Sequence, residues 1–288
     1  MTNKNITTEE MINLLKGTEY QTKEYNCTYI HDFEISNYFG DIHNIADELL
    51  HELGRFPTQD EFVALGVERA KEYFTTDVNA DGYKVAYVKT RSKGKTVHLK
   101  WSEALKANVM NRLARTYNSQ LVEYTTAIQI KQILNKAGES QYKVGMDLKV
   151  DLLMGVDLVV ADKERDKVIY IHIIKNTKNS KKSLQGKRNK NLYAIGFGRL
   201  KCYWKRTWTD SHVAFAFDVE ESDSTMIVNG NPIFKPEWLE NKLNEIMDDE
   251  KLELDTCDPD GSQIADFHFW LVKNRINGYR KGLRSFWI

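Results

Sequence analysis

Cysteine is scarce in this chain, and the spacing of the three cysteines excludes two kinds of stabilising chemistry. Cys27, Cys202 and Cys257 lie far apart in a sequence of 288 residues and form no Cys-x-x-Cys pair. Neither a disulfide framework nor a zinc site is therefore expected, and a reducing compartment is indicated.

Long apolar runs and an export signal are missing as well. No stretch of about 18 apolar residues occurs, and the first residues, MTNKNITTEEMINLL, are polar and acidic where a signal peptide is basic and then hydrophobic. We expect no membrane association and a cytoplasmic location. The apolar fraction of 41% is still sufficient for a hydrophobic core.

Several familiar enzyme motifs are absent. The sequence has no P-loop, no Gly-x-Gly-x-x-Gly after a strand, no Gly-x-Ser-x-Gly and no His-Glu-x-x-His. These absences narrow the enzyme classes without identifying one.

Acidic residues are missing from one long segment. Between Lys167 and Thr209 there is no Asp or Glu, whereas there are twelve Lys and Arg, and much of the balancing acid follows in residues 218–260. Such a split indicates a polyanionic partner for one face of the protein. The alternative is that the basic and acidic segments pair with each other in the fold.

Residues 1–75 have the pattern of a helical N-terminal module. Apolar residues at helical spacing stop at Gly54, and Thr58 with Glu61 predicts a capping box for a short second helix that ends at Gly66. This pair resembles, over about twenty residues, the helix-turn-helix element of sigma factors. An ordinary helical hairpin is the interpretation we prefer.

The rest of the chain reads as a mixture of helices and strands. We expect a hairpin or linker at 76–101, a nuclease-like core at 102–217 and a C-terminal helical extension at 218–288 that contains an acidic helix beginning at Pro236. Within the core, one bent helix or two helices are expected at 102–137 and a loop with a short helix at 176–191. Strands are expected at 142–153, 156–161 and 167–175, and in the runs NLYAIGFGRLKCYW and HVAFAFDV.

A charged residue lies in or at the end of each of two apolar runs. The run KVIYIHIIK is apolar on both faces and ends at Lys175, and Asp157 lies in the neighbouring run GVDLVV. Because a buried charge is costly unless it is paired, Asp157 could supply the partner of Lys175. His172, on the opposite face of its strand, is expected to be a hydrogen-bonded core histidine.

These residues resemble the PD-(D/E)XK nuclease superfamily over roughly residues 115–217. The family pattern is a helix with a glutamate, a hairpin whose second strand begins with an aspartate, a strand with acid-x-Lys and a helix with polar residues. Glu123, Asp157 and Lys175 match it in order and spacing. The resemblance implies an α/β (α+β) fold, a restriction-endonuclease-like core with a central mixed sheet flanked by helices.

The resemblance also implies an activity, Mg²⁺- or Mn²⁺-dependent hydrolysis of phosphodiester bonds by an endonuclease. Asp157, Lys175 and Glu123 would be catalytic, with Asp157 and Glu123 as metal ligands. One position departs from the pattern, because Ile173 stands where the family has Asp or Glu. A metal would then depend on Asp157, a backbone carbonyl and a carboxylate such as Glu123 or Asp151.

A structural interpretation of the same residues is equally open. Asp157 could cap a hairpin, and Lys175 could reach solvent from the end of its strand. Ile173 favours a related alternative, a non-catalytic nuclease-fold protein that binds DNA or another protein, for example a phage-encoded inhibitor of host defence. The Lys-, Asn- and Ile-rich composition suits an AT-rich bacterium or its phage.

Polar and basic residues follow the strand that ends at Lys175, where they could neutralise a phosphate backbone. Nucleic acid, with DNA preferred, is therefore the expected partner. The candidate contacts are Lys178, Lys181, Lys182, Gln185, Lys187, Arg188 and Lys190.

The C-terminal tail combines aromatic and basic residues and ends in Phe-Trp-Ile. Exposed aromatics are avoided on soluble surfaces, so this tail is expected to dock. It would cover its own domain or insert into another subunit, and the second would make a homo-oligomer.

Overall fold

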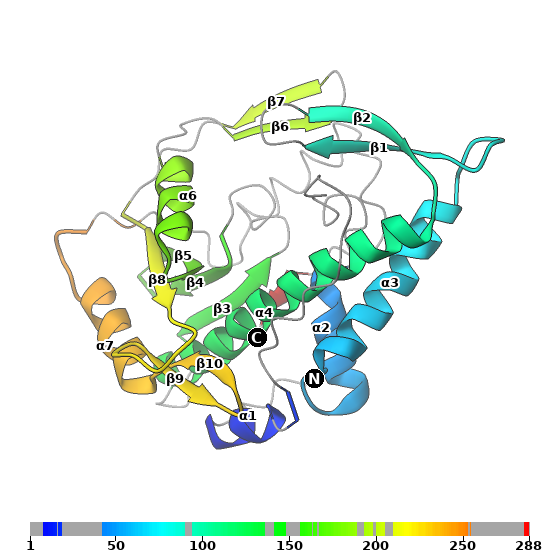
Figure 1. Cartoon of the computed structure of the whole chain (residues 1–288). Helices are drawn as coiled ribbons and strands as arrows, with labels where there is room; N and C mark the ends of the chain where they lie inside the picture. Colours follow the sequence, from blue (N-terminus) through cyan, green and yellow to red (C-terminus); the bar gives the residue numbers. More distant parts are fainter. Residues whose placement is uncertain are drawn as a thin grey trace. The chain divides into compact units, whose positions relative to one another are not determined.

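The computed structural model divides the chain into two compact units, which are described separately (Figure 1). The sheet unit comprises Met1–Ile12, Val122–Asn277 and Arg284–Ile288, and the helical unit comprises Asn13–Leu121 and Gly278–Leu283. Helix α1 covers Thr8–Leu14. The residues that the structure describes are 8–15, 17–18, 42–89, 94–135, 141–147, 156–162, 164–165, 167–188, 193–197, 200–204, 210–252, 254 and 285–287.

The helical unit contains the predicted capping box. Helices α2 (Ile42–Leu53) and α3 (Gln59–Thr75) are joined by a short connection in which Gly54 has a positive φ. The Thr58 hydroxyl accepts a hydrogen bond from the Glu61 N–H at 3.3 Å, and the Glu61 carboxylate accepts one from the Thr58 N–H at 2.7 Å. The predicted start of α3 is therefore confirmed, and its cause is the reciprocal pairing of these two residues.

The predicted end of α3 at Gly66 is wrong, because the helix continues to Thr75. Gly66 is buried inside α3, and a Cβ atom at this position would lie 2.6 Å from both Cδ atoms of Leu113. Glycine thus permits the close approach of a neighbouring helix and does not stop the helix here. Gly66 was interpreted as the end of the helix, but a glycine is present there because Leu113 packs against this position.

Two further predictions for this part of the chain are confirmed. Strands β1 (Lys84–Lys89) and β2 (Gly94–Leu99) form an antiparallel hairpin. A single helix, α4 (Glu103–Leu134), occupies the region predicted to hold one bent helix or two helices.

A five-stranded mixed sheet forms the centre of the sheet unit. Its strand order is β11-β3-β4-β5-β8, in which β5 and β8 are parallel and the other neighbouring pairs are antiparallel. The bounds are β3 Tyr142–Asp147, β4 Leu158–Asp162, β5 Lys167–Lys175, β8 His212–Phe217 and β11 Ser285–Trp287. Helix α6 (Lys178–Arg188) follows β5 as predicted.

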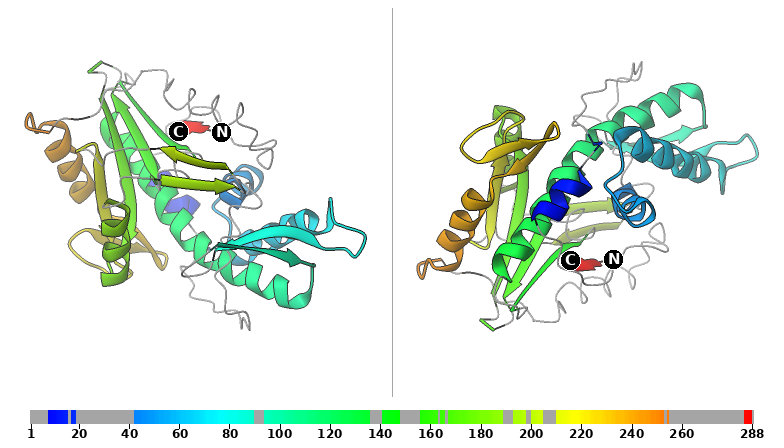
Figure 2. Two further views of the ribbon diagram at one scale, coloured as in Figure 1. Left: turned by 90° about the horizontal axis from the view of Figure 1, so that it is seen from above. Right: turned by 90° about the horizontal axis from the view of Figure 1, so that it is seen from below.

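Two hairpins differ from the predictions. The run NLYAIGFGRLKCYW forms an antiparallel pair, β6 (Tyr193–Phe197) with β7 (Leu200–Trp204), instead of one strand. The extension predicted as helical begins with a hairpin of β9 (Thr225–Val228) and β10 (Asn231–Phe234) before the expected acidic helix, α7 (Pro236–Met247). Both views of Figure 2 show α7 beside this hairpin.

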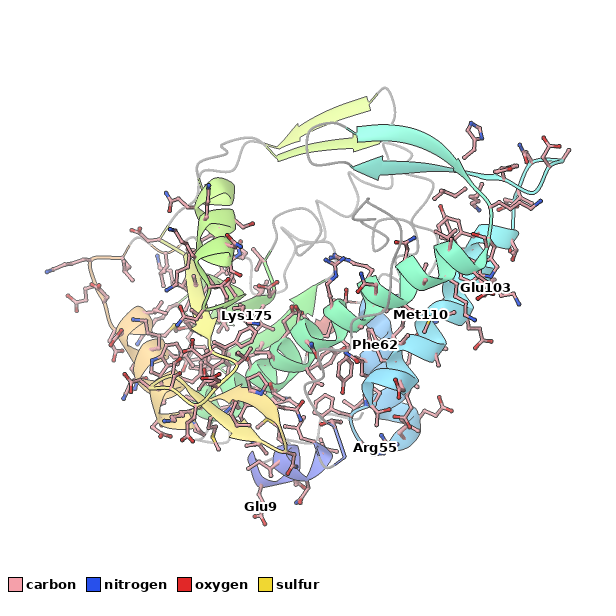
Figure 3. The ribbon with its side chains drawn as sticks, in the orientation of Figure 1. Glu9, Arg55, Phe62, Glu103, Met110 and Lys175 are labelled. Carbon is pink, nitrogen blue, oxygen red and sulfur yellow. The ribbon has the colours of Figure 1, made fainter. Side chains whose placement is uncertain are left out.

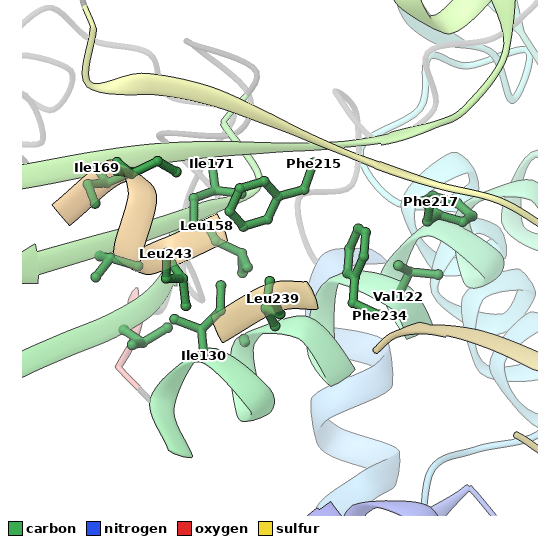
Figure 4. Packing of buried hydrophobic residues seen from close by; sticks show 14 residues of the cluster. Val122, Ile130, Leu158, Ile169, Ile171, Phe215, Phe217, Phe234, Leu239 and Leu243 are labelled. Atoms are coloured by element: carbon green, nitrogen blue, oxygen red, sulfur yellow. The ribbon is translucent and has the colours of Figure 1, made fainter. Parts of the chain in front are cut away.

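Helices α4 and α7 pack on one face of the sheet (Figure 4). Leu158, Ile171 and Phe215 project from three neighbouring strands into a core that α4 and α7 complete with apolar side chains. The helical residues in this core are Val122, Ala127 and Ile130 of α4 and Leu239, Leu243 and Ile246 of α7. The sheet is therefore held by burial of apolar area, the dominant favourable contribution in folding.

The C-terminal tail contributes a strand to its own chain. Ser285, Phe286 and Trp287 pair with Asp147, Met146 and Gly145 of β3. This pairing agrees with the first of the two predicted alternatives, docking on the tail's own domain. Residues 255–284 lie outside the described part of the chain. No helix in the described part is long and apolar enough to span a membrane.

Candidate nucleic-acid interface

Asp157 and Lys175, which the sequence analysis singled out, lie at the same edge of the sheet, where β5 ends. Strand β4 runs antiparallel to β5, so the residue before β4, Asp157, lies at the edge where β5 ends at Lys175. Strand β8 runs parallel to β5 and ends at the same edge, where the Asn176 N–H donates to the Phe217 carbonyl at 2.7 Å. The topology thus brings Asp157 and Lys175 to one side of the sheet.

Asp157 caps the end of the β4–β5 ladder. Its N–H donates to the Ile171 carbonyl at 3.0 Å, and its Oδ2 accepts a hydrogen bond from the Ile173 N–H at 2.5 Å. The regular pairing stops at Leu158 and Ile171, so the carboxylate takes the place of the next backbone acceptor. This contact agrees with the capping role, one of the two interpretations that the sequence left open for Asp157.

Lys175 is half-buried at the end of β5 (Figure 3). Among the described residues, the Lys175 side chain forms no hydrogen bond or ion pair, including with Asp157. A lysine in this position can carry its charge past the sheet edge while its methylene groups stay against apolar surface.

Glu123 is half-buried in α4. At 3.6 residues per turn it falls within the stripe of α4 that contains Val122, Ala127 and Ile130 and packs on the sheet. The described residues contain no group of three or more His, Cys, Asp or Glu that could hold a metal ion, so Glu123 and Asp157 are not gathered into such a group.

His172 is a buried and hydrogen-bonded histidine, as predicted. It is 1% exposed, and its Nε2 lies 3.0 Å from Nδ1 of His212 on β8. The His212 ring also stacks on Tyr170, with ring centroids 4.8 Å apart. The pair joins the two parallel strands on the face opposite Lys175, and it belongs to the packing of the sheet.

Helix α6 displays the predicted contacts on one exposed face. Lys178, Lys181, Lys182 and Gln185 are all exposed, and their spacing of three or four residues places them on the same side of the helix. Lys187 and Arg188 belong to α6, but their side chains lie outside the described part of the structure, as does the whole of Lys190. We call Lys178, Lys181, Lys182 and Gln185 the α6 face.

The start of α6 is fixed by a residue that the sequence analysis missed. The Thr177 hydroxyl accepts a hydrogen bond from the Ser180 N–H at 3.1 Å, which is the arrangement of a helix N-cap. The signal was present, because a Thr directly before a helical segment is a common cap. Since α6 has no acidic residue, its positive N-terminal dipole and its lysines act in the same direction on an anion.

One acidic residue near this edge was also missed. Asp218 directly follows β8 and is half-buried, and its N–H donates to the Thr225 hydroxyl at 3.0 Å. Because Asn176 follows β5 at the matching register, Asp218 lies at the same sheet edge as Lys175. The strand pattern of apolar residues in HVAFAFDV ends next to Asp218, so the sequence did contain the signal that places Asp218 at the end of β8.

The fully exposed charged residues of α3 are mostly acidic. The exposed residues of α3 include Asp60, Glu68 and Glu72, with Lys71 as the exposed base. Such a surface would repel a phosphate backbone. The ordinary helical hairpin therefore stays the interpretation that we prefer for this pair.

Comparisons with models of known families, with curated proteins and with solved structures found no match to this chain.

The metal site implied by the resemblance to PD-(D/E)XK nucleases can be tested against these residues. That site requires two carboxylates and a strand carbonyl. Ile173 has no side-chain donor atom, and one oxygen of Asp157 accepts a hydrogen bond from the Ile173 N–H. Asp151, the other candidate ligand, lies outside the described part of the structure. The carboxylate that the family has at position 173 is therefore missing from the donor set.

Proposed function

We propose that this protein binds nucleic acid through the α6 face, on a core of the restriction-endonuclease-like type, and that it acts as a non-catalytic binding factor. The observation that carries the proposal is the α6 face itself. Three exposed lysines and a glutamine lie on one side of a helix within a segment that contains no acidic residue from Lys167 to Thr209.

The order of the elements supports the core type. Helix α4 is followed by the antiparallel strands β3, β4 and β5, then by α6 and by β8 parallel to β5. This order agrees with the family pattern of helix, hairpin, active strand and polar helix. Ile173 and the capping role of Asp157 favour binding without cleavage.

The binding can be measured as a salt dependence. If Lys178, Lys181 and Lys182 each meet a phosphate, they contribute about −2.7 to the slope of log K against log salt concentration on duplex DNA. Between 50 and 200 mM salt this corresponds to a loss of about 40-fold in affinity. Replacement of all three by alanine should therefore flatten the slope by about that amount.

A matched control removes the same charge elsewhere. Lys71, Lys106 and Lys251 lie on α3, on α4 and after α7, away from the α6 segment in sequence. Their replacement by alanine should leave the slope unchanged. Equal losses for both triple variants would mean that net charge alone governs binding, and the proposed interface would be wrong.

The same samples test cleavage. Labelled single- and double-stranded DNA and RNA are incubated with the wild type in Mg²⁺, in Mn²⁺ and in EDTA, and retention and products are scored on one gel. We expect retention without products. Metal-dependent products would contradict the non-catalytic assignment and support the predicted nuclease, and the absence of both would direct the search to protein partners.

A further inference from the structure

Helix α6 is open to solvent around most of its circumference. Among its residues 178–186 none is buried, and its one large apolar residue, Leu184, is half-buried together with Ser180. At about 3.6 residues per turn, Ser180 and Leu184 form one line along the helix, which is the side that packs on the protein. Figure 1 shows α6 beside β5, the strand that it contacts. Lys182 lies two residues from both Ser180 and Leu184 and therefore on the opposite side of the helix.

A second exposed side of α6 lies next to the α6 face and carries no charge. Asn179, Ser183 and Gly186 follow one another at spacings of four and three residues, so they share one side of the helix. Asn179 and Ser183 are exposed, and the Asn179 side chain forms no hydrogen bond with another described residue. The exposed part of α6 thus has a cationic side and a neutral polar side.

Packing within the protein does not explain the glycine on the neutral side. Gly186 is half-buried, yet a Cβ atom at this position would meet nothing within 4 Å. Glycine in a helix is destabilising relative to alanine, and one of its uses is to let the backbone come close to a ligand. Gly186 therefore leaves room for a partner to approach the backbone of α6.

The exposure of α6 fits one kind of nucleic acid best. An α-helix with its side chains is about 10–12 Å across, and the major groove of B-DNA, about 12 Å wide, admits one. A helix can enter a groove only if most of its circumference is open, as it is in α6. The major groove of duplex RNA is too narrow for side chains to read, and a single strand has no groove. Duplex DNA therefore matches α6.

The two exposed sides of α6 match the two kinds of surface in such a groove. Phosphates border the groove and position a protein, whereas base edges carry the sequence. The lysines of the α6 face have long side chains that reach phosphates. Asn179 has a short side chain near the N-terminus of α6, and recognition helices contact base edges with their N-terminal residues. An asparagine amide pairs with N6 and N7 of adenine.

We propose that α6 lies in the major groove of duplex DNA, with the lysines of the α6 face on phosphates and Asn179 on the edge of an adenine. The inference rests on the proposed function, because it requires that the α6 face contacts nucleic acid. It adds the duplex as the ligand, the groove as the place of contact and Asn179 as a residue that determines specificity.

Removal of one acceptor from the DNA tests the contact of Asn179. In a duplex whose adenines are replaced by 7-deazaadenine, the N7 acceptor is lost from the major groove while the charge stays the same. We expect the full-length wild type to bind this duplex about 5-fold or more weakly than the unmodified one, the lower limit for one such pair. Asn179→Ala should bind both duplexes equally, with an unchanged salt slope because no charge is lost.

A matched control makes the same substitution on another helix. Asn241 is an exposed asparagine of α7, and Asn241→Ala should discriminate between the two duplexes as the wild type does. Equal binding of the two duplexes by the wild type would overturn the contact with adenine. Discrimination that persists in Asn179→Ala would assign the contact to another residue, and the inference would be wrong.

Gly186→Ala supplies an independent measurement of the close approach. This variant should unfold at a higher temperature than the wild type and yet bind duplex DNA several-fold more weakly, because the added methyl group would meet the groove. A purely structural role would raise the stability without a loss of affinity. An affinity equal to that of the wild type would therefore contradict the approach of this turn to DNA.

Binding to other nucleic acids separates the inference from the proposed function. The wild type and the variant without Lys178, Lys181 and Lys182 are titrated with duplex DNA, single-stranded DNA and duplex RNA. We expect duplex DNA to bind most tightly. Binding that depends on the three lysines but is equal for all three ligands would overturn entry into the groove and leave the α6 face in place. Absence of binding to every ligand would overturn the proposed function itself.

Discussion

Replacement of Asp157 by alanine should loosen the end of the β4–β5 ladder. The carboxylate accepts the Ile173 N–H at 2.5 Å, and alanine leaves this backbone donor without its acceptor. A hydrogen bond to a charged group contributes about 1.5–3 kcal/mol. At about 1.4 kcal/mol for each factor of ten, exchange of the Ile173 amide hydrogen should become about 10- to 150-fold faster.

Asparagine at the same position provides a graded comparison. It keeps an oxygen acceptor but loses the charge, and a neutral hydrogen bond contributes about 0.5–1.5 kcal/mol. Asp157→Asn should therefore lie between the wild type and Asp157→Ala. Asp210→Ala is the control, because Asp210 is an exposed residue in the turn before β8.

Amide-resolved hydrogen exchange by NMR is the assay, with denaturant unfolding as a second measurement. An exchange rate at Ile173 that is the same in Asp157→Ala as in the wild type would refute the capping role. It would also remove one of the two observations that favour binding without cleavage. Rapid exchange throughout the sheet would show a general loss of stability instead of a local opening.

Four further predictions concern other parts of the molecule. Gly66→Ala should destabilise the protein by about 1–3 kcal/mol, because the new Cβ would lie 2.6 Å from the Leu113 methyl groups. Gly186→Ala in α6 should instead stabilise the protein by about 0.5–1 kcal/mol, because a Cβ there meets nothing within 4 Å. Thermal unfolding of the two variants measures both effects. The hydrogen bond from Arg55 lowers the pKa of Glu61 from 4.5 to about 2. The stabilisation by Glu61 is therefore present above pH 4.5 and is lost as the pH falls towards 2. In a pH series of unfolding curves, Glu61→Gln should remove this part of the acid dependence. Thr177→Ala should cost about 1 kcal/mol of α6 stability and weaken DNA binding without a change in charge, and Thr177→Ser should restore both in exchange and binding assays. Asp218→Asn should tighten DNA binding at low salt, because it removes a negative charge from the sheet edge, and an unchanged or lower affinity in a titration would contradict this placement.

Local signals in the sequence predicted most of the elements. The capping box of Thr58 and Glu61 and the uninterrupted helical pattern of α4 are properties of neighbouring residues, and the structure confirms both. The hairpin of β9 and β10 was missed although its signal is local. Asn229 and Gly230, both with positive φ, form the two-residue turn that an Asn-Gly pair favours.

Other features depend on residues that are distant in sequence. The role of Gly66 is set by Leu113, and the hydrogen bond between His172 and His212 requires the parallel pairing of β5 with β8. The sequence placed Asp157 and Lys175 at one sheet edge, but the choice between pairing and capping depends on where the β4–β5 ladder ends. A periodic pattern gives the strands and leaves that end undetermined.

The pairing of β11 with β3 has a consequence for synthesis of the chain. The two strands are separated by about 140 residues, so the ribosome completes the partner of β3 on the order of ten seconds after β3 itself. During this interval one edge of β3 lacks its final neighbour, and unpaired strand edges are sites of aggregation. A nascent chain stalled within this interval should therefore engage chaperones more strongly than the finished one.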